Sequence, residues 1–343
     1  MSLRLEMLQV ARLAPRLLGD SASLVRDFLL RQQNADGGFK DRSGRSDLYY
    51  TVFGMDAWLA VEVQTSSSRR EEAPFPICNS QSATCNQSEP PHVGCYRVSE
   101  SPLKVQSPPA FKPIEPFLRA FDDGAGLDFV HLCCLARAWA QCRTGVAPVS
   151  NFISHLESFR SSDGGYHQAA GSQSGSAYGC FLALGAYQDL KAALPDPAGV
   201  LRCLHSLETP DGAWTNSIRP PASGVRAPQP GSTNATAAAI TILRNLGQPV
   251  PARAADWLLA RLHPHGGFLA APDAPLPDLL STATALHALS GMQVPLDGLQ
   301  EKCLDFIDSL WTNEGSFHGH WAEDVLDAEY TFYGLLALGH LSL

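Results

Sequence analysis

The stretch from His265 to Met292, HGGFLAAPDAPLPDLLSTATALHALSGM, contains every part of a unit that recurs along the chain. It opens on a Gly-Gly-aromatic turn, continues through a proline-rich loop to Asp278, and enters an apolar helix rich in alanine, leucine and threonine. Because glycine accepts backbone conformations with positive φ, such a turn ends one helix and lets the chain reverse before the next. The stretch therefore predicts two helices joined by a turn.

The same pattern occurs six times. Four further copies carry the turns DGGF, DGGY, DGAW and EGSF at residues 36–39, 163–166, 211–214 and 314–317, and one copy begins at Asp128 without a glycine turn. The predicted second-helix starts are Asp47, Asp128, Gln173, Ser232, Asp278 and Asp327. Asp and Ser are typical N-caps, because their side chains accept hydrogen bonds from free first-turn amides. A period of about 48 residues predicts an array of six helical hairpins.

The two helices of each copy differ in charge. Second helices such as ATAAAITIL and STATALHAL are almost uncharged, whereas first helices such as ARAADWLLARL carry charges along one side. A helix that is apolar on nearly all sides is buried, and an amphipathic helix faces solvent. We therefore expect an all-α protein, an α/α toroid with an inner and an outer ring of six helices each, as a single domain over residues 1–343. The inner-helix starts should lie at one end of the ring.

Composition narrows the function. The chain has 343 residues, of which 45% are hydrophobic, and a net charge of −9, whereas a general nucleic-acid binder presents a basic face. We therefore expect no nucleic-acid partner. No run of 18 apolar residues predicts a transmembrane segment, and charges at Arg4, Glu6 and Arg12 interrupt any signal-peptide core. We expect a cytoplasmic protein.

Residues 64–113 interrupt the repeats. This segment is rich in Ser, Pro, Gln and Asn and has no helical period, which predicts a mobile or disordered insertion. The spacing of its Cys78, Cys85 and Cys95 matches no zinc pattern. The six other cysteines lie in predicted helices, where buried free thiols are the usual interpretation.

The copies NADGGFKDRSGRSDLYYTVFGMDAWLAV, SDGGYHQAAGSQSGSAYGCFLALGAY and EGSFHGHWAEDVLDAEYTFYGLLALGHL resemble the repeats of protein prenyltransferase β subunits and, more distantly, those of squalene-hopene-type terpene cyclases. The resemblance covers nearly the whole chain outside 64–113. It implies an α/α toroid whose apolar funnel binds an isoprenoid, as a polyprenyl diphosphate. It also implies a zinc cofactor and a helical partner similar to an α subunit.

The zinc ligands implied by the resemblance are missing. The family uses an Asp-x-Cys-Tyr helix start and an Asp-x-x-His-Thr start in the next copy. Two residues after the predicted helix starts, this chain has Tyr49, Val130, Gly175, Asn234, Leu280 and Glu329. Only Asp128 is followed three residues later by a histidine, His131. This match lies in the second copy, where the family does not place its zinc site. The sequence therefore supports no cofactor, and we interpret Asp128 as an N-cap.

The diphosphate site of the family is matched at one position of three. Arg226 stands six residues before Ser232, as the family's arginine does, while Gln229 replaces a lysine and Gln173 a histidine. We predict that Arg226, with the positive ends of the inner helices, receives the charged head of an isoprenoid. The cyclase motif Asp-x-Asp-Asp-Thr-Ala reads STNATA at residues 232–237, without a carboxylate.

Candidate ligand-binding residues come mainly from aromatic positions of the inner helices, because an apolar funnel suits a polyprenyl chain. They are Tyr49, Tyr50, Phe53, Trp58, Tyr178, Phe181, Tyr330 and Tyr333, with Asp278 and Asp327 at two helix starts. Ordinary core packing explains the aromatic residues equally well. His318 and His320, with carboxylates nearby, are weak metal candidates, although a polar loop before the last helix explains them too.

Three functions fit these patterns. The first is a prenyltransferase-like toroid that binds an isoprenoid or other apolar small molecule; an enzyme of this kind would be a transferase without the usual zinc-thiolate site. The second is a non-catalytic binding or scaffold protein. The third is a glycan-active toroid enzyme, which needs two opposed carboxylates at the funnel mouth, with Asp278, Asp327 and Glu329 as candidates. The catalytic residues, the ligand and its chain length stay open.

Overall fold

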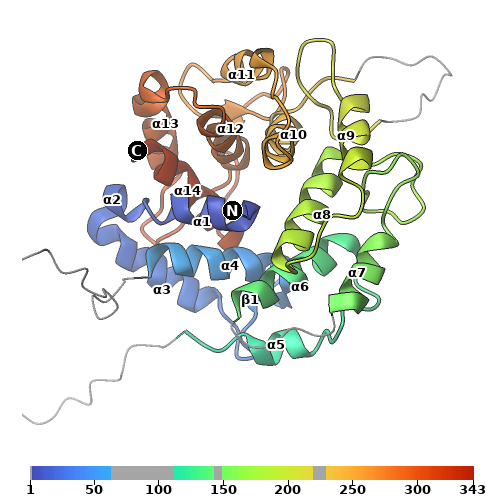
Figure 1. Ribbon diagram of the computed structural model, residues 1–343. Helices are drawn as coiled ribbons and strands as arrows, with labels where there is room; N and C mark the ends of the chain where they lie inside the picture. The colour runs from blue at the N-terminus through green and yellow to red at the C-terminus, as the bar shows by residue number, and fades with distance from the viewer. Residues whose placement is uncertain (1, 63–110, 143–148, 219–228) are drawn as a thin grey trace, which may run out of the picture. The chain divides into compact units, whose positions relative to one another are not determined.

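Six inner helices stand in a ring in the computed structural model, which describes residues 2–62, 111–142, 149–218 and 229–343 (Figure 1). They are α4 (Leu48–Val61), α6 (Phe129–Gln141), α8 (Ala177–Asp189), α10 (Thr233–Asn245), α12 (Leu279–Gly291) and α14 (Ala328–Leu341). Each packs against the next, and α14 packs against α4, so the order closes.

An outer helix precedes each inner one. The outer helices are α3 (Ala22–Gln32), α5 (Glu115–Arg119), α7 (Val149–Glu157), α9 (Pro197–Ser206), α11 (Ala252–Leu259) and α13 (Asp297–Leu310). The hydrophobic core lies between the two rings and includes the fully buried Phe28, Phe152 and Phe306. The predicted all-α toroid of six hairpins is confirmed. Among the described residues, no helix is long and apolar enough to span a bilayer.

The Gly-aromatic turns fasten the two rings together. Their aromatic residues, Phe39, Tyr166, Trp214, Phe268 and Phe317, are at most 1% exposed. Each forms an antiparallel bridge with the residue six positions earlier, at the end of the outer helix. In two copies the turn continues as a short hairpin, β1 (Phe39–Lys40) with β2 (Ser46–Asp47) and β3 (Phe268–Leu269) with β4 (Pro277–Asp278). Each turn therefore buries its aromatic side chain and sets the direction of the next helix.

A threonine in the first turn of the inner helix completes this joint. Thr51 Oγ1 accepts a hydrogen bond from the amide of Phe39 at 2.9 Å. Thr236 accepts one from Trp214 at 3.0 Å, and Thr282 accepts one from Phe268 at 2.9 Å. These amides are buried away from water, so the hydroxyl supplies the partner that each of them needs.

The helix starts agree with the sequence in five copies and differ in one. Asp47, Asp128, Ser232, Asp278 and Asp327 all cap inner helices, each side chain accepting an amide of the first turn. In the third copy the cap is Ser176, and Gln173 lies three residues before it in the preceding loop. The alignment at Gln173 was therefore wrong, because the serine hydroxyl, which accepts from the Gly179 amide, determines where this helix begins.

The N-terminal helix α1 (Leu3–Ala11) crosses the ring at the C-terminal ends of the inner helices (Figure 1). Arg4 pairs with Asp189 of α8 at 3.3 Å, and Glu6 pairs with Arg244 of α10 at 3.1 Å. Two short helices, α2 (Pro15–Leu18) and the 3₁₀ helix η1 (Gly19–Ser21), lead from α1 to α3. The inner ring is thus covered by α1 at one end.

Most of the predicted insertion at 64–113, including its three cysteines, lies outside the described residues. Its last residues do fall within them. Phe111 stacks on Trp58 with ring centroids 4.6 Å apart. The backbone of Lys112 exchanges hydrogen bonds with the Gln33 side chain at 2.8 and 2.9 Å. Phe111 and Lys112 therefore pack against the first copy of the repeat.

Candidate functional site

A cavity of about 390 Å³ lies inside the inner ring. Its volume falls in the range of ordinary small-molecule pockets. Five inner helices and α1 line it, together with two residues from the segment between α9 and α10. The lining residues are Met7, Tyr49, Tyr178, Phe181, Asn216, Ser232, Asn234, Ala235, Ala237, Ala238, Thr241, Leu280, Thr284, His287 and Tyr333.

The wall of this cavity follows a regular pattern in the repeat. Tyr49, Tyr178, Asn234 and Leu280 all stand two residues after an inner-helix cap. In α8, α10 and α12, further wall residues follow three or four positions later, ending at Thr241 and His287. Residues with this spacing lie on one face of a helix. These three helices therefore each present one face to the cavity, and α4 and α14 each contribute a single tyrosine.

The carboxyl group of Glu329 lies behind this wall and is hydrogen-bonded to one of its residues. The Tyr49 hydroxyl donates to Glu329 Oε1 at 2.5 Å and joins α4 to α14. Burial raises the pKa of Glu329 to about 7, although the hydrogen bond from Tyr49 favours the ionised form. Carboxyl groups with pKa values near neutrality are suited to general acid or base catalysis. Glu329, which is hydrogen-bonded to Tyr49 of the wall, is therefore a candidate for proton transfer.

Neutral polar groups gather where α8, α10 and α12 begin. Asn216 Oδ1 accepts a hydrogen bond from the Tyr178 amide at 3.0 Å. The hydroxyl of Thr284 donates to Asn234 Oδ1 at 2.8 Å. Asn216, Ser232, Asn234 and Thr284 all line the cavity, so amide and hydroxyl groups gather at this end of a mainly apolar wall. Such groups fix the orientation of a ligand in a mainly apolar pocket.

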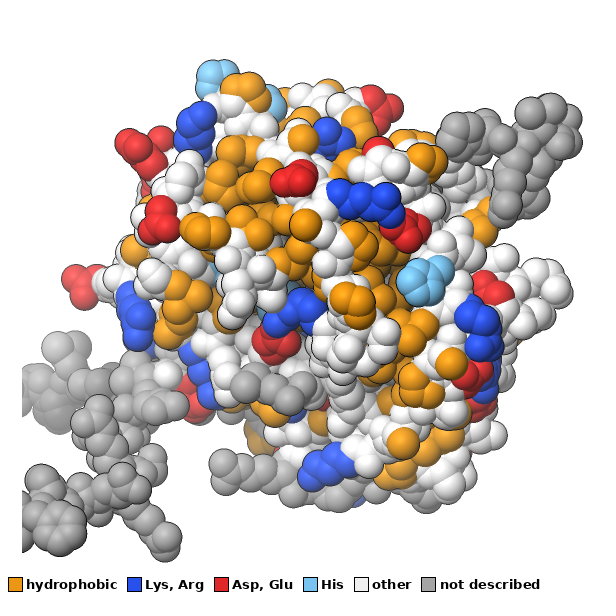
Figure 2. All heavy atoms as spheres, turned by 45° about the horizontal axis from the view of Figure 1, so that its top comes forward, with side chains coloured by type: hydrophobic (Ala, Val, Ile, Leu, Met, Phe, Trp, Pro, Cys, Tyr) orange, Lys and Arg blue, Asp and Glu red, His pale blue; other side chains and the backbone are white. Residues whose placement is uncertain are grey.

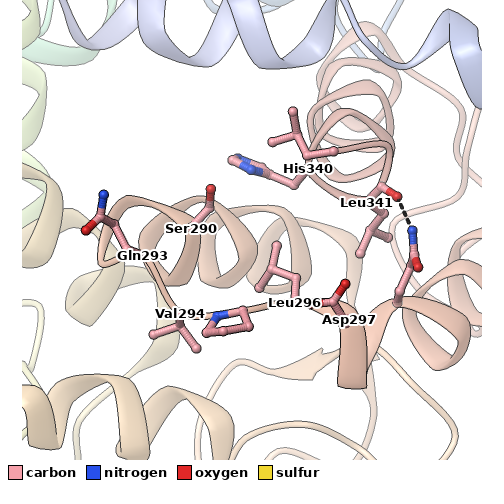
Figure 3. A pocket seen from close by; sticks show the side chains of 10 residues that line it. Ser290, Gln293, Val294, Leu296, Asp297, His340 and Leu341 are labelled. Atoms are coloured by element: carbon pink, nitrogen blue, oxygen red, sulfur yellow. Dashed lines mark hydrogen bonds between the residues drawn. The ribbon is translucent and has the colours of Figure 1, made fainter.

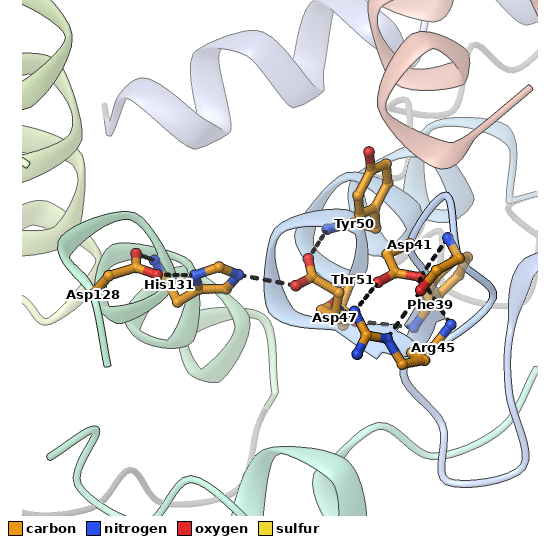
Figure 4. A network of polar contacts seen from close by, with 9 residues as sticks. Phe39, Asp41, Arg45, Asp47, Tyr50, Thr51, Asp128 and His131 are labelled. Atoms are coloured by element: carbon orange, nitrogen blue, oxygen red, sulfur yellow. Dashed lines mark hydrogen bonds and ion pairs between the residues drawn. The ribbon is translucent and has the colours of Figure 1, made fainter. Parts of the chain in front are cut away.

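A histidine connects two neighbouring helix caps at the same end of the ring. His131 Nδ1 lies 2.6 Å from Asp128 Oδ2, and His131 Nε2 lies 2.9 Å from Asp47 Oδ2 (Figure 4). The hydrogen bond to Asp47 raises the pKa of His131 to about 9 despite burial, with further help from Asp128. His131 is therefore a cation at neutral pH and links α4 to α6.

An arginine of the first copy forms ion pairs with carboxylates of the last copy. Arg42, in the loop between β1 and β2, pairs with Glu323 at 2.9 Å and with Asp327 at 3.3 Å. Its guanidinium also lies over the ring of Tyr330, 5.7 Å from the centroid. Tyr330 therefore belongs to this charged contact outside the cavity.

The other predicted aromatic residues divide into two groups. Tyr49, Tyr178, Phe181 and Tyr333 line the cavity. Phe53 packs behind them against Tyr49, Phe332 and Tyr333. Tyr50 packs edge-on against Tyr49, and Trp58 stacks on Phe111 away from the cavity. Tyr50, Phe53 and Trp58 of α4 therefore do not line this cavity.

The three carboxylates of the glycan hypothesis each have a structural partner. Asp278 accepts the Ser281 amide at 2.7 Å, and Asp327 accepts the Tyr330 amide at 2.9 Å. Burial raises the pKa of both. Glu329 is bound by Tyr49. Two of the three therefore act as helix caps, and the structure gives the glycan hypothesis no further support.

No group of three or more His, Cys, Asp or Glu side chains within the described ranges is placed to hold a metal ion. His320 lies 3.9 Å from Glu323, and His318 Nδ1 is buried without a partner. With the third copy aligned at Ser176, the position two residues after each cap holds Tyr49, Val130, Tyr178, Asn234, Leu280 and Glu329. These residues do not fit the zinc site implied by the family.

Arg226, predicted to receive a diphosphate, lies outside the described residues. On the face seen in Figure 2, positive and negative side chains are interspersed among hydrophobic and neutral ones, and no large basic patch forms. A separate pocket of about 270 Å³ lies between the end of α14 and the turn that joins α12 to α13 (Figure 3). His340 lines it and lies 3.1 Å from His287 of the cavity wall. No pattern in the sequence predicts this second pocket.

Comparison with known proteins identifies the repeats. A family model, the prenyltransferase alpha-alpha toroid domain, matches residues 7–90 and 235–341, more than half of the chain. No curated protein matches the sequence. The resemblance inferred from the repeats is therefore confirmed at the level of the family.

Solved structures share the fold at low sequence identity. A variant of the type II terpene cyclase MstE from Scytonema, in complex with its substrate geranylgeranyl dihydroxybenzoate, is 12% identical with a TM-score of 0.56. The match covers 96% of this chain and 97% of that chain. The apo form of that cyclase is also 12% identical, with a TM-score of 0.54 and coverage of 95% and 97%. At this identity, the likeness concerns the fold alone.

Proposed function

The chain belongs to the prenyltransferase alpha-alpha toroid domain family, and on that premise we propose that it binds an isoprenoid chain inside the inner ring. The observation that carries this proposal is the cavity of about 390 Å³, with Phe181, Leu280 and three alanines of α10 in its wall. Burial of apolar surface drives binding, at roughly 25 cal/mol for each Å² removed from water. A flexible hydrocarbon chain suits such a wall.

Two further observations support an isoprenoid over other apolar molecules. Tyr49, Tyr178 and Tyr333 present aromatic rings to the cavity, and such rings pack well against a branched, unsaturated chain. The MstE variant of the same fold is in complex with geranylgeranyl dihydroxybenzoate. That ligand belongs to the cyclase, and it indicates the class of molecule worth testing here.

The polar group of the ligand is expected near the N-terminal ends of the inner helices. Asn216, Ser232 and Asn234 offer hydrogen bonds there. The prediction that Arg226 receives a diphosphate remains a proposal. If it holds, Arg226→Ala weakens binding of geranylgeranyl diphosphate and leaves binding of geranylgeraniol, which has only a hydroxyl, unchanged.

A second candidate function is acid catalysis on the bound chain. It is favoured by Glu329, whose pKa of about 7 leaves part of the population protonated at neutral pH. The protonated carboxyl can give a proton to a ligand that displaces or joins the Tyr49 hydroxyl. No step of this proposal runs through zinc, because the residues present do not fit that metal.

The proposal is tested by titrating the full chain with geranylgeraniol and following intrinsic fluorescence. Ala238→Phe fills the cavity from α10, where Ala238 is part of the wall, and should weaken binding at least about tenfold by occupying the volume the chain needs. Ala252→Phe is the matched control, because Ala252 is exposed on the outer helix α11. Equal affinity in all three proteins would show that the ligand binds elsewhere.

A further inference from the structure

Two spaces follow each other along α8. The central cavity touches Tyr178 and Phe181, whereas a smaller chamber of about 50 Å³ touches Phe181, Leu182, Gly185 and Asp189. These positions are mostly three or four residues apart and therefore lie along one side of the helix. The chamber thus lies next to the cavity, toward the C-terminal end of α8.

Two side chains stand between the spaces. Phe181 of α8 and Met7 of α1 each line both the cavity and the chamber. Phe181 is partly buried at the edge of the core. Met7 is unbranched and adapts its shape to its surroundings at low cost. Phe181 and Met7 are therefore the two residues that the linings of the cavity and the chamber share.

The chamber has open space beside a glycine. A Cβ atom added to Gly185 would meet no other atom within 4 Å. Cys133, Cys134 and Arg137 of α6 also line it, as do Arg4 and Asp189, which form an ion pair with each other. The chamber is therefore a short extension of the cavity, with room for about three water-sized groups.

We propose that Phe181 and Met7 determine how long an apolar chain the cavity accepts, because they separate it from the chamber beside Gly185. The proposal rests on the proposed function for the kind of chain only, since the partition stops any chain that enters among Asn216, Ser232 and Asn234. Each additional methylene that becomes buried raises affinity roughly fourfold. A chain that reaches the chamber therefore gains affinity that a blocked chain does not.

The test measures binding of two series of probes to the full chain, polyprenols of 10 to 30 carbons and unbranched 1-alkanols of 8 to 20 carbons. Phe181→Ala should move the preferred length upward, with about a tenfold gain for the first chain beyond the wild-type optimum. Gly185→Leu fills the chamber where space is open, so the double variant Phe181→Ala/Gly185→Leu should lose at least half of that shift. Met7→Ala removes the partition from α1 and should act in the same direction as Phe181→Ala.

The outcomes separate this proposal from the proposed function. An unchanged length preference in Phe181→Ala and Met7→Ala, with both proteins folded by circular dichroism and binding probes, overturns the partition and leaves cavity binding intact. Alkanols that shift in length while no polyprenol binds support the partition and overturn the isoprenoid. Binding of neither series to the wild type overturns both. If Phe181→Ala does not fold, Phe181→Leu and Met7→Ala decide the question.

Discussion

Glu329 is held where burial and hydrogen bonding act in opposite directions. Burial raises its pKa to about 7, above the ordinary 4.5, while Tyr49 donates a hydrogen bond that favours the ionised form. Because the folded state holds the proton of Glu329 more tightly than the unfolded state, the protein is more stable at low pH. This contribution is complete below the pKa of the unfolded state, and it is lost as the pH rises through the pKa of the folded state. The pH window for Glu329 is therefore about 4.5 to 7.

Glu329→Gln removes this titration and keeps a hydrogen-bond acceptor for Tyr49. We expect the free energy of unfolding of the wild type to fall by about 2 kcal/mol relative to the variant between pH 5 and pH 8. Urea denaturation of both proteins at several pH values measures this difference. Parallel curves at all pH values would contradict the raised pKa.

His131 also stabilises the protein at lower pH, but it does so over a different pH range. Its pKa is raised to about 9 by Asp47 and Asp128, so its contribution is complete below the unfolded value of about 6.5 and is lost as the pH rises through 9. The side chain is about one-third exposed, so solvent screening reduces the effect.

We expect His131→Gln to lower the unfolding free energy by about 1 kcal/mol at pH 6 and by much less at pH 10. The same comparison with His205→Gln, at an exposed position of the outer helix α9, controls for general effects of losing a histidine. A deficit of His131→Gln that persists unchanged at pH 10 would mean that its role does not depend on charge.

At the scale of elements, the turn and the first turn of the inner helix act as one joint. Thr236 Oγ1 accepts the amide of Trp214 at 3.0 Å, and both residues are at most 1% exposed. Thr236→Val keeps the shape and leaves that amide without a partner, which should cost about 1–3 kcal/mol. Thr241→Val in the same helix is the control, because Thr241 donates to the Ala237 carbonyl of its own helix. Chemical denaturation giving equal losses would argue against the joint.

The sequence predicts these elements well where chemistry is local. Asp and Ser caps, glycine turns and an apolar period lie within a few residues of one another, so five of six inner-helix starts were correct. The Gln173 start failed because Ser176, three residues on, also caps well and the third copy has no threonine to mark the register. The pairing of Tyr49 with Glu329 spans 280 positions, and no local pattern predicts it.

The cavity wall, too, depends on contacts between distant parts of the chain that no local pattern predicts. The position two residues after each cap is the family's cysteine position, and in four of the six copies, at Tyr49, Tyr178, Asn234 and Leu280, it lines the cavity. Sequence alone does not say which side of an apolar helix faces the ring centre, because inner helices are apolar all round. Trp58 was therefore grouped with Tyr178, although it stacks on Phe111.

At the scale of the whole molecule, residues 64–110 do not follow the sequence pattern of the repeats. A chain in which a short Gly/Ser linker replaces residues 64–110 keeps Phe111 on Trp58 and Lys112 on Gln33. Because loop length affects stability only weakly, we expect the thermal midpoint to change by less than about 5 °C. Calorimetry of both chains measures it, and a larger fall would show that the segment contributes to the packed core.

Binding inside the ring is tested most directly by photo-cross-linking. A geranylgeraniol analogue with a diazirine on the chain, irradiated with the full-length protein, should label residues of α8, α10, α12 and α14 that line the cavity, such as Phe181, Ala238 and Tyr333. Excess unlabelled geranylgeraniol should prevent the labelling, which peptide mass spectrometry locates. Labelling confined to outer helices or to residues 63–110, and insensitive to competitor, would contradict an isoprenoid site inside the ring.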